Sequence, residues 1–207
     1  MPLIRRNPEA ADPVAPPAAA AFDGLNDHAP DVRAAASRRL ARLGGGPAAL
    51  GDALGRETDE RVREAIFTSM ALADTAEAVE ALLPHLRSDD AGLRRGTLDA
   101  LRAMASVARP YLPRLLDDPD PDVRLLACEI IRELPASDAM PLIRNLLERE
   151  TVLNVCASAV DVVAEIGSAA LLPALALCAA RFADDPFLTF AIAVARKRIG
   201  VVDDRHD

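Results

Sequence analysis

The chain has 207 residues and a formal net charge of −8, because 32 Asp and Glu outnumber 24 Lys and Arg. Binding to nucleic acid requires clustered positive charge against the phosphates, so we expect no nucleic-acid partner. Trp is absent and Tyr111 is the only Tyr. The core must therefore consist of Ala, Leu, Val and Ile, which suits closely packed helices.

The cysteine count and the N-terminus indicate a cellular compartment. Three cysteines without a CxxC pair predict neither a disulfide framework nor a zinc site. Arg5 and Arg6 are not followed by the apolar segment of a secretory signal. No uninterrupted apolar run reaches the roughly 18 residues of a membrane span. We expect a cytoplasmic protein that does not contact the membrane.

The first 20 residues are rich in Pro and Ala and have few large side chains. Such a segment buries too little apolar area to offset the entropy of ordering it. We predict a flexible tail over residues 1–20, a folded domain over 21–200 and an acidic tail over 201–207.

From residue 22 onwards one short phrase recurs along the chain. Its aligned Val or Leu positions are 30, 31, 30, 32 and 33 residues apart, at Val32, Val62, Leu93, Val123, Val155 and Leu188. A fixed period of this length is typical of a repeat array. Positions four, eight and eleven residues later lie on the same helical face. Each phrase is predicted to be an amphipathic helix whose aligned Val or Leu is buried.

Caps and turns delimit these helices. Acidic residues stand where a helix N-terminus needs a cap, at Asp31, Asp59, Asp89 or Asp90, Asp120 or Asp122, and Asp184 or Asp185. Turns are predicted where Gly or Pro follows the helix, at Gly44, Pro135, Gly167 and Gly200. Second helical stretches then follow at 47–54, 76–86, 109–116, 139–147 and 170–180. The predicted unit is helix, turn, helix, loop.

The pattern D-x-D-V-R-x-x-A-x-x-x-L, followed by a second helix that contains Pro, resembles the HEAT repeat. It resembles specifically the short HEAT-like repeat of phycobilisome lyases and many bacterial proteins, and the resemblance covers residues from about 22 to 200. It implies an all-α, armadillo-type fold: a right-handed α-solenoid of about five helix-turn-helix repeats plus a C-terminal capping helix. Because this fold hosts many functions, it leaves the activity open.

An arginine column follows the aligned core position, at Arg33, Arg63, Arg94 and Arg124. Each arginine has a capping carboxylate of the neighbouring unit at the same spacing, which favours a structural ladder between repeats. The alternative is an anion site. In the last two units the column contains Cys156 and Thr189, so the ladder is expected to stop there.

The C-terminal units are unusually apolar, with only five charged residues between Thr151 and Ala195. One interpretation is a sandwiched fifth unit, with a final capping helix that directs Arg196, Lys197 and Arg198 outward. The other is a partner or homodimer surface anchored by Phe182, Phe187 and Phe190.

No arrangement of residues predicts catalysis, a cofactor or a metal. His28, His85 and His206 are scattered and none precedes Glu, unlike the His-Glu pairs by which HEAT-like deoxyhypusine hydroxylases bind iron. Cys128, Cys156 and Cys178 lie among apolar residues and are expected to be buried. We therefore predict no catalytic, cofactor or metal site.

The predicted function is a non-catalytic scaffold or adaptor that binds another protein. The resemblance implies that the second helices line the concave groove. Polar positions on them are the candidate contacts: Glu77, Glu80, Arg87, Tyr111, Arg114, Arg144, Asn145 and Glu148. The alternative is a lyase-like or cofactor-maturation factor acting on a client protein, as similarity to the phycobilisome lyases suggests.

Overall fold

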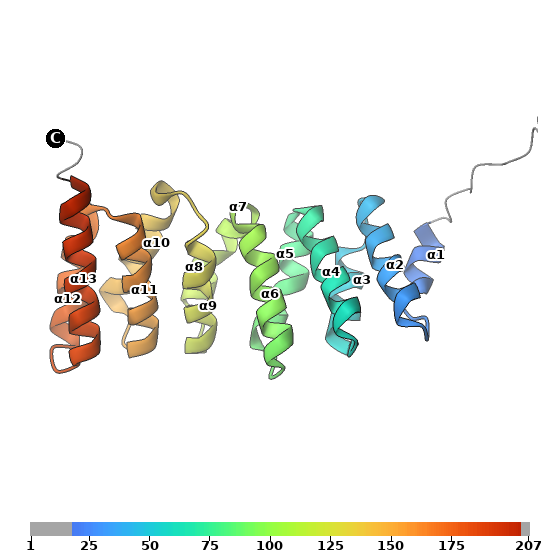
Figure 1. Cartoon of the computed structure of the whole chain (residues 1–207), viewed down its shortest axis with the longest axis horizontal. Coiled ribbons are helices and arrows are strands. Elements are labelled where there is room, and N and C mark those ends of the chain that lie inside the picture. The colour runs from blue at the N-terminus through green and yellow to red at the C-terminus, as the bar shows by residue number, and fades with distance from the viewer. Residues whose placement is uncertain (1–17, 204–207) are drawn as a thin grey trace, which may run out of the picture.

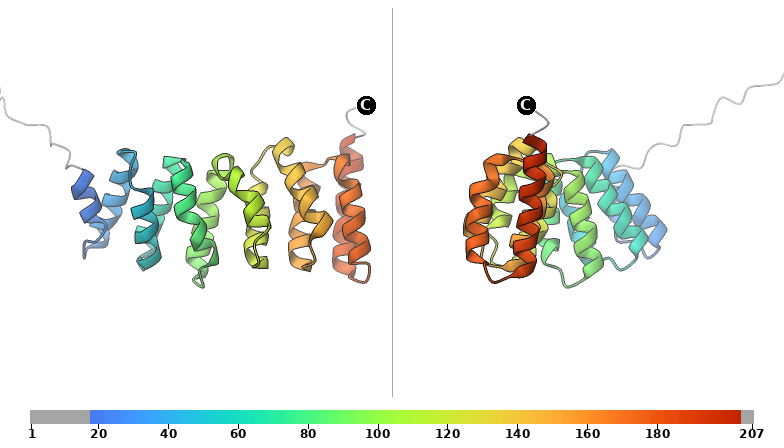
Figure 2. Two further views of the ribbon diagram at one scale, coloured as in Figure 1. Left: turned by 180° about the vertical axis from the view of Figure 1, so that it is seen from behind. Right: turned by 60° about the vertical axis from the view of Figure 1, so that its left-hand side comes forward.

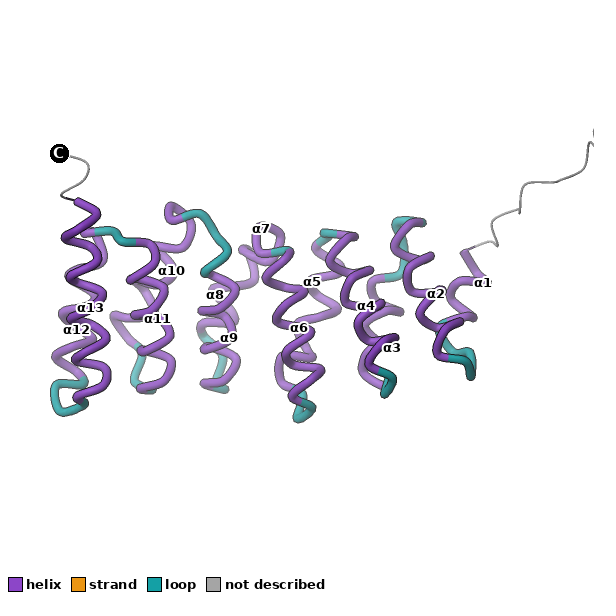
Figure 3. Tube along the Cα trace, viewed as in Figure 1, coloured by secondary structure: helices purple, strands orange, loops and turns teal. Residues whose placement is uncertain are grey.

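The computed structural model describes residues 18–203, and every regular element in that range is a helix. The helices form a row of pairs along the long axis of the molecule (Figure 1), joined by short loops (Figure 3). The predicted all-α solenoid is therefore confirmed. No helix in this range is long and apolar enough to cross a membrane.

The first helices of the units form one layer, at the front of Figure 1. They are α2 (Pro30–Arg42), α4 (Glu60–Ala73), α6 (Ala91–Ala103), α9 (Pro121–Ile131), α11 (Leu153–Ile166) and α13 (Pro186–Asp203). Neighbours in this layer pack against each other along the array. A short additional helix, α1 (Ala18–Gly24), packs on α2 at the N-terminal end.

The second helices form the layer behind. They are α3 (Pro47–Arg56), α5 (Ala76–Leu82), α8 (Leu112–Leu116), α10 (Ala136–Arg149) and α12 (Leu172–Arg181). Short helical segments extend several of them: η1 (Leu83–Arg87), α7 (Ala105–Ala108), η2 (Arg109–Tyr111) and η3 (Ala169–Leu171). The predicted domain boundaries fall inside α1 and α13, and the remaining tail residues, 1–17 and 204–207, lie outside the described range.

The aligned core positions are buried in five units, at Val62, Leu93, Val123, Val155 and Leu188. The prediction is wrong for Val32, which is 42% exposed. Val32 lies in the first turn of α2, and among the described residues the seven-residue α1 is the one helix that precedes it. A solenoid unit buries its apolar face against its neighbours, so the first unit leaves this position partly uncovered.

The predicted caps are present at four helix starts. The carboxylates of Asp59, Asp90, Asp120 and Asp185 accept hydrogen bonds from backbone amides of α4, α6, α9 and α13. Asp31 was expected to cap α2 but lies inside its first turn, where Ala29 holds the cap position without a side-chain bond. The helix begins at Pro30, whose ring already fixes a helical φ.

The turns depend on left-handed backbone where glycine was expected. Gly44 and Gly167 both have φ of +66°, which a residue with a Cβ rarely adopts. The prediction of a turn at Gly200 is wrong, because α13 continues through it to Asp203. Near that end, no second helix folds back within the described residues to require a reversal.

Candidate protein-binding surfaces

The arginine column joins successive units, as at Arg33. Its guanidinium donates to both carboxylate oxygens of Glu57 in the next unit, at 2.7 and 2.9 Å, and to the carbonyl oxygen of Asp27 in its own loop at 2.9 Å. The hydrogen bond from Arg33 is the main cause that lowers the pKa of Glu57. One side chain thus fixes two consecutive loops.

The same arrangement recurs at Arg124. It donates to both oxygens of Glu150, at 2.7 and 3.0 Å, and to the carbonyl of Asp118 at 2.8 Å. Burial alone would raise the pKa of Glu150, but the hydrogen bond from Arg124 and those from two backbone amides lower it. Both carboxylates lie five residues before an aligned Val, in the loop, and neither is a capping Asp.

The other two arginines of the column show variations. Arg63 donates to the capping Asp90 at 2.7 Å and to the carbonyl of Glu57 at 2.8 Å. Arg94 donates to the carbonyl of Ser88 at 2.5 Å. The sequence predicted a capping acid as the partner of every arginine in the column. Among these four arginines, only Arg63 pairs with one, Asp90. Because carboxylates and carbonyls occupy these guanidinium groups, the column favours a structural ladder over an anion site.

A second arginine column was missed by the sequence analysis. It lies at the C-terminal ends of the second helices, at Arg56, Arg87, Arg149 and Arg181. Arg56 donates to Asn26, Arg87 pairs with Asp118 and Arg149 pairs with Asp117. Arg181 donates to the carbonyls of Leu147, Glu148 and Glu150. The repeat period of the sequence could have revealed this column. Arg181 links the fifth unit to the fourth where the first column ends at Cys156.

The predicted contact residues on the second helices lie on one layer, and several of them link neighbouring units. The hydroxyl of Tyr111 donates to Glu80 at 2.9 Å, and this bond is the main cause that raises the pKa of Tyr111. Arg144 donates to the carbonyl of Ala170 at 3.4 Å. Arg87 pairs with Asp118, which lies outside this predicted strip.

The remaining predicted residues of this strip stay more accessible. Asn145 accepts a hydrogen bond from Arg149 at 2.9 Å within α10. Glu77, Arg114 and Glu148 are exposed. Glu77 and Glu80 also border a hollow of about 570 Å³ between α3 and α5. The strip remains a candidate contact face, with much of its hydrogen-bonding capacity used between repeats.

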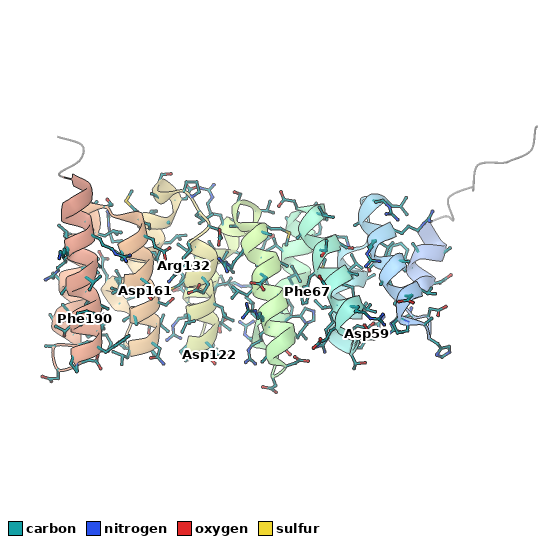
Figure 4. All side chains as sticks on the ribbon, viewed as in Figure 1. Asp59, Phe67, Asp122, Arg132, Asp161 and Phe190 are labelled. Atoms are coloured by element: carbon teal, nitrogen blue, oxygen red, sulfur yellow. The ribbon has the colours of Figure 1, made fainter. Side chains whose placement is uncertain are left out.

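A groove on the opposite layer, between α4 and α6, was not predicted. Its centre is Phe67 of α4, which lies between the two helices (Figure 4). A Cβ atom at Gly96 of α6 would stand only 2.2 Å from the Phe67 ring. Glycine in a helix interior costs about 1 kcal/mol relative to Ala, so the close approach of this ring accounts for Gly96.

The groove measures about 420 Å³ and combines an apolar floor with an acidic rim. Phe67, Gly96 and neighbouring Ala side chains form the floor. Glu60, Glu64 and Asp99 line the rim together with Arg63, whose charge is engaged by Asp90. Among the described residues, neither Glu60 nor Glu64 has an ion-pair partner. The sequence signals for this groove were an aromatic residue in an aromatic-poor chain and the Gly92 and Gly96 pair, four residues apart.

The C-terminal phenylalanines divide into two kinds. Phe182, at the end of α12, packs partly buried against the core. Phe187 and Phe190 of α13 are 67% and 69% exposed. The structure therefore leaves two of the three predicted anchors available at the end of the array.

The candidate reactive groups are enclosed or scattered. All three cysteines are free and buried, and burial raises the pKa of the Cys128 thiol to about 12. His85 contacts the carbonyl of Gly51 at 3.1 Å, and His28 lies exposed in the first loop. His206 lies outside the described residues. Within the described range, no cluster of His, Cys, Asp and Glu has the arrangement of a metal site.

Comparison with known proteins agrees with this architecture. A family model described as HEAT repeats matches residues 18–102 and 108–192. A search of the curated proteins finds no match. Among solved structures, a chain from the structural study of microtubule plus-end tracking by XMAP215, CLIP-170 and EB1 has a TM-score of 0.58 at 14% identity, covering 87% of this chain and 90% of that one.

Two further structures are less similar. A designed armadillo repeat protein in complex with the peptide (KR)4 has a TM-score of 0.46 at 16% identity, covering 86% of this chain and 98% of that one. The complex of CpcE and CpcF of phycocyanin lyase from Nostoc has a TM-score of 0.38 at 17% identity, covering 84% and 86%. At these identities the likeness concerns the fold alone.

Proposed function

Because this chain belongs to the HEAT-repeat proteins, whose fold commonly serves as a protein-interaction scaffold, we propose that it is a non-catalytic scaffold. In this proposal the groove between α4 and α6 binds a segment of another protein. The observation that carries the proposal is the half-buried Phe67, held over Gly96 on the floor of a 420 Å³ groove. A concave apolar site with a few charged groups is the usual form of a binding site.

The rim defines the chemistry of the bound segment. Glu60 and Glu64 lie on α4 one turn apart, and Asp99 lies on α6. Asp99 already pairs with Arg95 and Arg102. A segment that places an apolar side chain on Phe67 and a Lys or Arg side chain beside Glu60 and Glu64 would satisfy both features. A guanidinium stacked on the exposed part of the Phe67 ring would gain further attraction.

The experiment is affinity capture by the whole chain and by variants of the groove. Glu64→Lys reverses one rim charge and Phe67→Ala removes the floor. Leu72→Ala is the matched control, because Leu72 lies on the same helix, is 76% exposed and does not line this groove. We expect the groove variants to lose a partner that the control retains, and cross-linking to place that partner on α4 and α6. Capture of the same proteins by all variants would refute the groove.

The alternative function, a lyase-like or maturation factor, needs an accessible thiol or a pocket with convergent polar groups. The thiols of Cys128, Cys156 and Cys178 are buried, which argues for the scaffold. The same capture distinguishes the two functions. A client of a maturation factor would carry an altered mass or absorbance after contact with this protein, whereas a scaffold would leave its partner unmodified.

A further inference from the structure

The outer side of α13, the last helix that the structure describes, carries two strongly exposed phenylalanines, Phe187 and Phe190. Figure 2 shows α13 and α12 together at the C-terminal end. One side of α13 packs against α11, α12 and η3. Its buried side chains there include Leu188, Ile192 and Ile199. Exposed large apolar side chains gathered on one helix face indicate an interaction surface.

The exposed side of α13 has the spacing of a helix-packing seam. Phe187, Phe190, the half-buried Val194 and Lys197 follow one another at intervals of three, four and three residues. This is the interval by which two helices pack along each other. The seam is therefore complementary to another helix, and Figure 4 shows Phe190 on the outer edge of the array.

The charges at the two ends of the seam are opposite in sign. Asp184 is exposed just before the helix, and Lys197 and Arg198 are exposed in its C-terminal half. Two copies of α13 placed antiparallel, with a two-fold axis beside Phe190, bring Phe187 opposite Val194 of the partner subunit. The same placement brings Asp184 opposite Lys197 of the partner subunit. Each copy thus supplies the apolar residues and the counter-charge that the other one needs.

From this self-complementarity we infer that α13 is a homodimerisation helix, which pairs antiparallel with α13 of a second copy of this chain. The interface lies on α13, away from α4 and α6, so it is independent of the proposed groove. An isologous contact of this kind closes after two copies and does not extend into a filament. An acid just before a helix also stabilises the helix itself, so the test of Asp184 must distinguish the two effects.

The first test measures the dimer dissociation constant of the full chain by sedimentation equilibrium. Phe190→Asp places two carboxylates beside the two-fold axis, and we expect it to weaken the dimer about thirty-fold or more. Because Phe190 is 69% exposed, the circular dichroism of the variant should be unchanged. Leu72→Asp introduces the same charge at an exposed site on α4 and should leave the dimer intact.

The second test exchanges the end charges. Asp184→Lys and Lys197→Glu should each weaken the dimer about five-fold, and the double variant should restore it. If the two charges acted only within their own copy of the helix, the double variant would show no recovery of the dimer. A wild-type chain that is monomeric at every concentration, or that grows beyond a dimer, would overturn the inference.

Discussion

Arg124 and Glu150 form a two-pronged ion pair across the junction between the fourth and fifth units, with hydrogen bonds of 2.7 and 3.0 Å. The Glu150 side chain is almost fully buried and the Arg124 side chain is largely so. A further bond from Arg124 reaches the carbonyl of Asp118 in the preceding loop. The pair therefore sets the position of one repeat relative to the next.

Arg124→Met should destabilise the protein by about 2 kcal/mol, because it leaves the buried carboxylate of Glu150 without its charged donor. Urea unfolding followed by circular dichroism measures this change. Arg61→Met is the matched control: the Arg61 side chain is 72% exposed in its pairs with Asp31 and Asp59, and exposed pairs contribute little. Equal midpoints for Arg124→Met and wild type would contradict the assigned role.

Acid should weaken the junctions between repeats. The pKa values of Glu57 and Glu150 are lowered in the folded chain, so these groups favour folding fully above their unfolded pKa of about 4.3. Their contribution disappears as the pH falls through the lower folded values. We expect the free energy of unfolding to fall below about pH 4, and to fall less steeply in a Glu57→Gln, Glu150→Gln double variant. Parallel pH profiles for the two proteins would refute this linkage.

The burial of the aligned Val and Leu positions can be tested by placing Asp at a buried position and at a partly exposed one. Val123→Asp places an unpaired charge where the side chain is fully buried and should cost about 3 kcal/mol or more. Val32→Asp should cost much less, because Val32 is partly exposed beside the short α1. Thermal unfolding distinguishes the two variants. Similar losses at both positions would contradict this difference in burial.

The contact between Phe67 and Gly96 predicts a compensating pair. Gly96→Ala improves helix propensity but forces the Phe67 ring aside, so we expect a net loss of about 1–3 kcal/mol. In a Phe67→Ala background the same change should be neutral or stabilising, since the ring is gone. A double-mutant cycle by urea unfolding measures the difference. A Gly96→Ala substitution that stabilises the wild-type chain would show that the ring does not hold this position.

The sequence by itself determined the local features of this protein. Residues only a few positions apart set the apolar face of each helix and the Asp caps of α4, α6, α9 and α13. The same holds for the left-handed turns at Gly44 and Gly167. Helical periodicity and capping chemistry translate such spacing directly into helices. The repeat period then places each helix beside its equivalent in the next unit.

Only the tertiary structure decided which side chains meet across the units. Arg33 selects Glu57 in the loop, 24 residues away, although the capping Asp59 lies only two residues further along the chain. Phe67 meets Gly96, and Arg181 reaches back to Glu150. These partners depend on how far one helix pair is rotated and shifted against the next. Small shifts change which atoms come within hydrogen-bond or van der Waals distance, and the repeat period alone does not specify them.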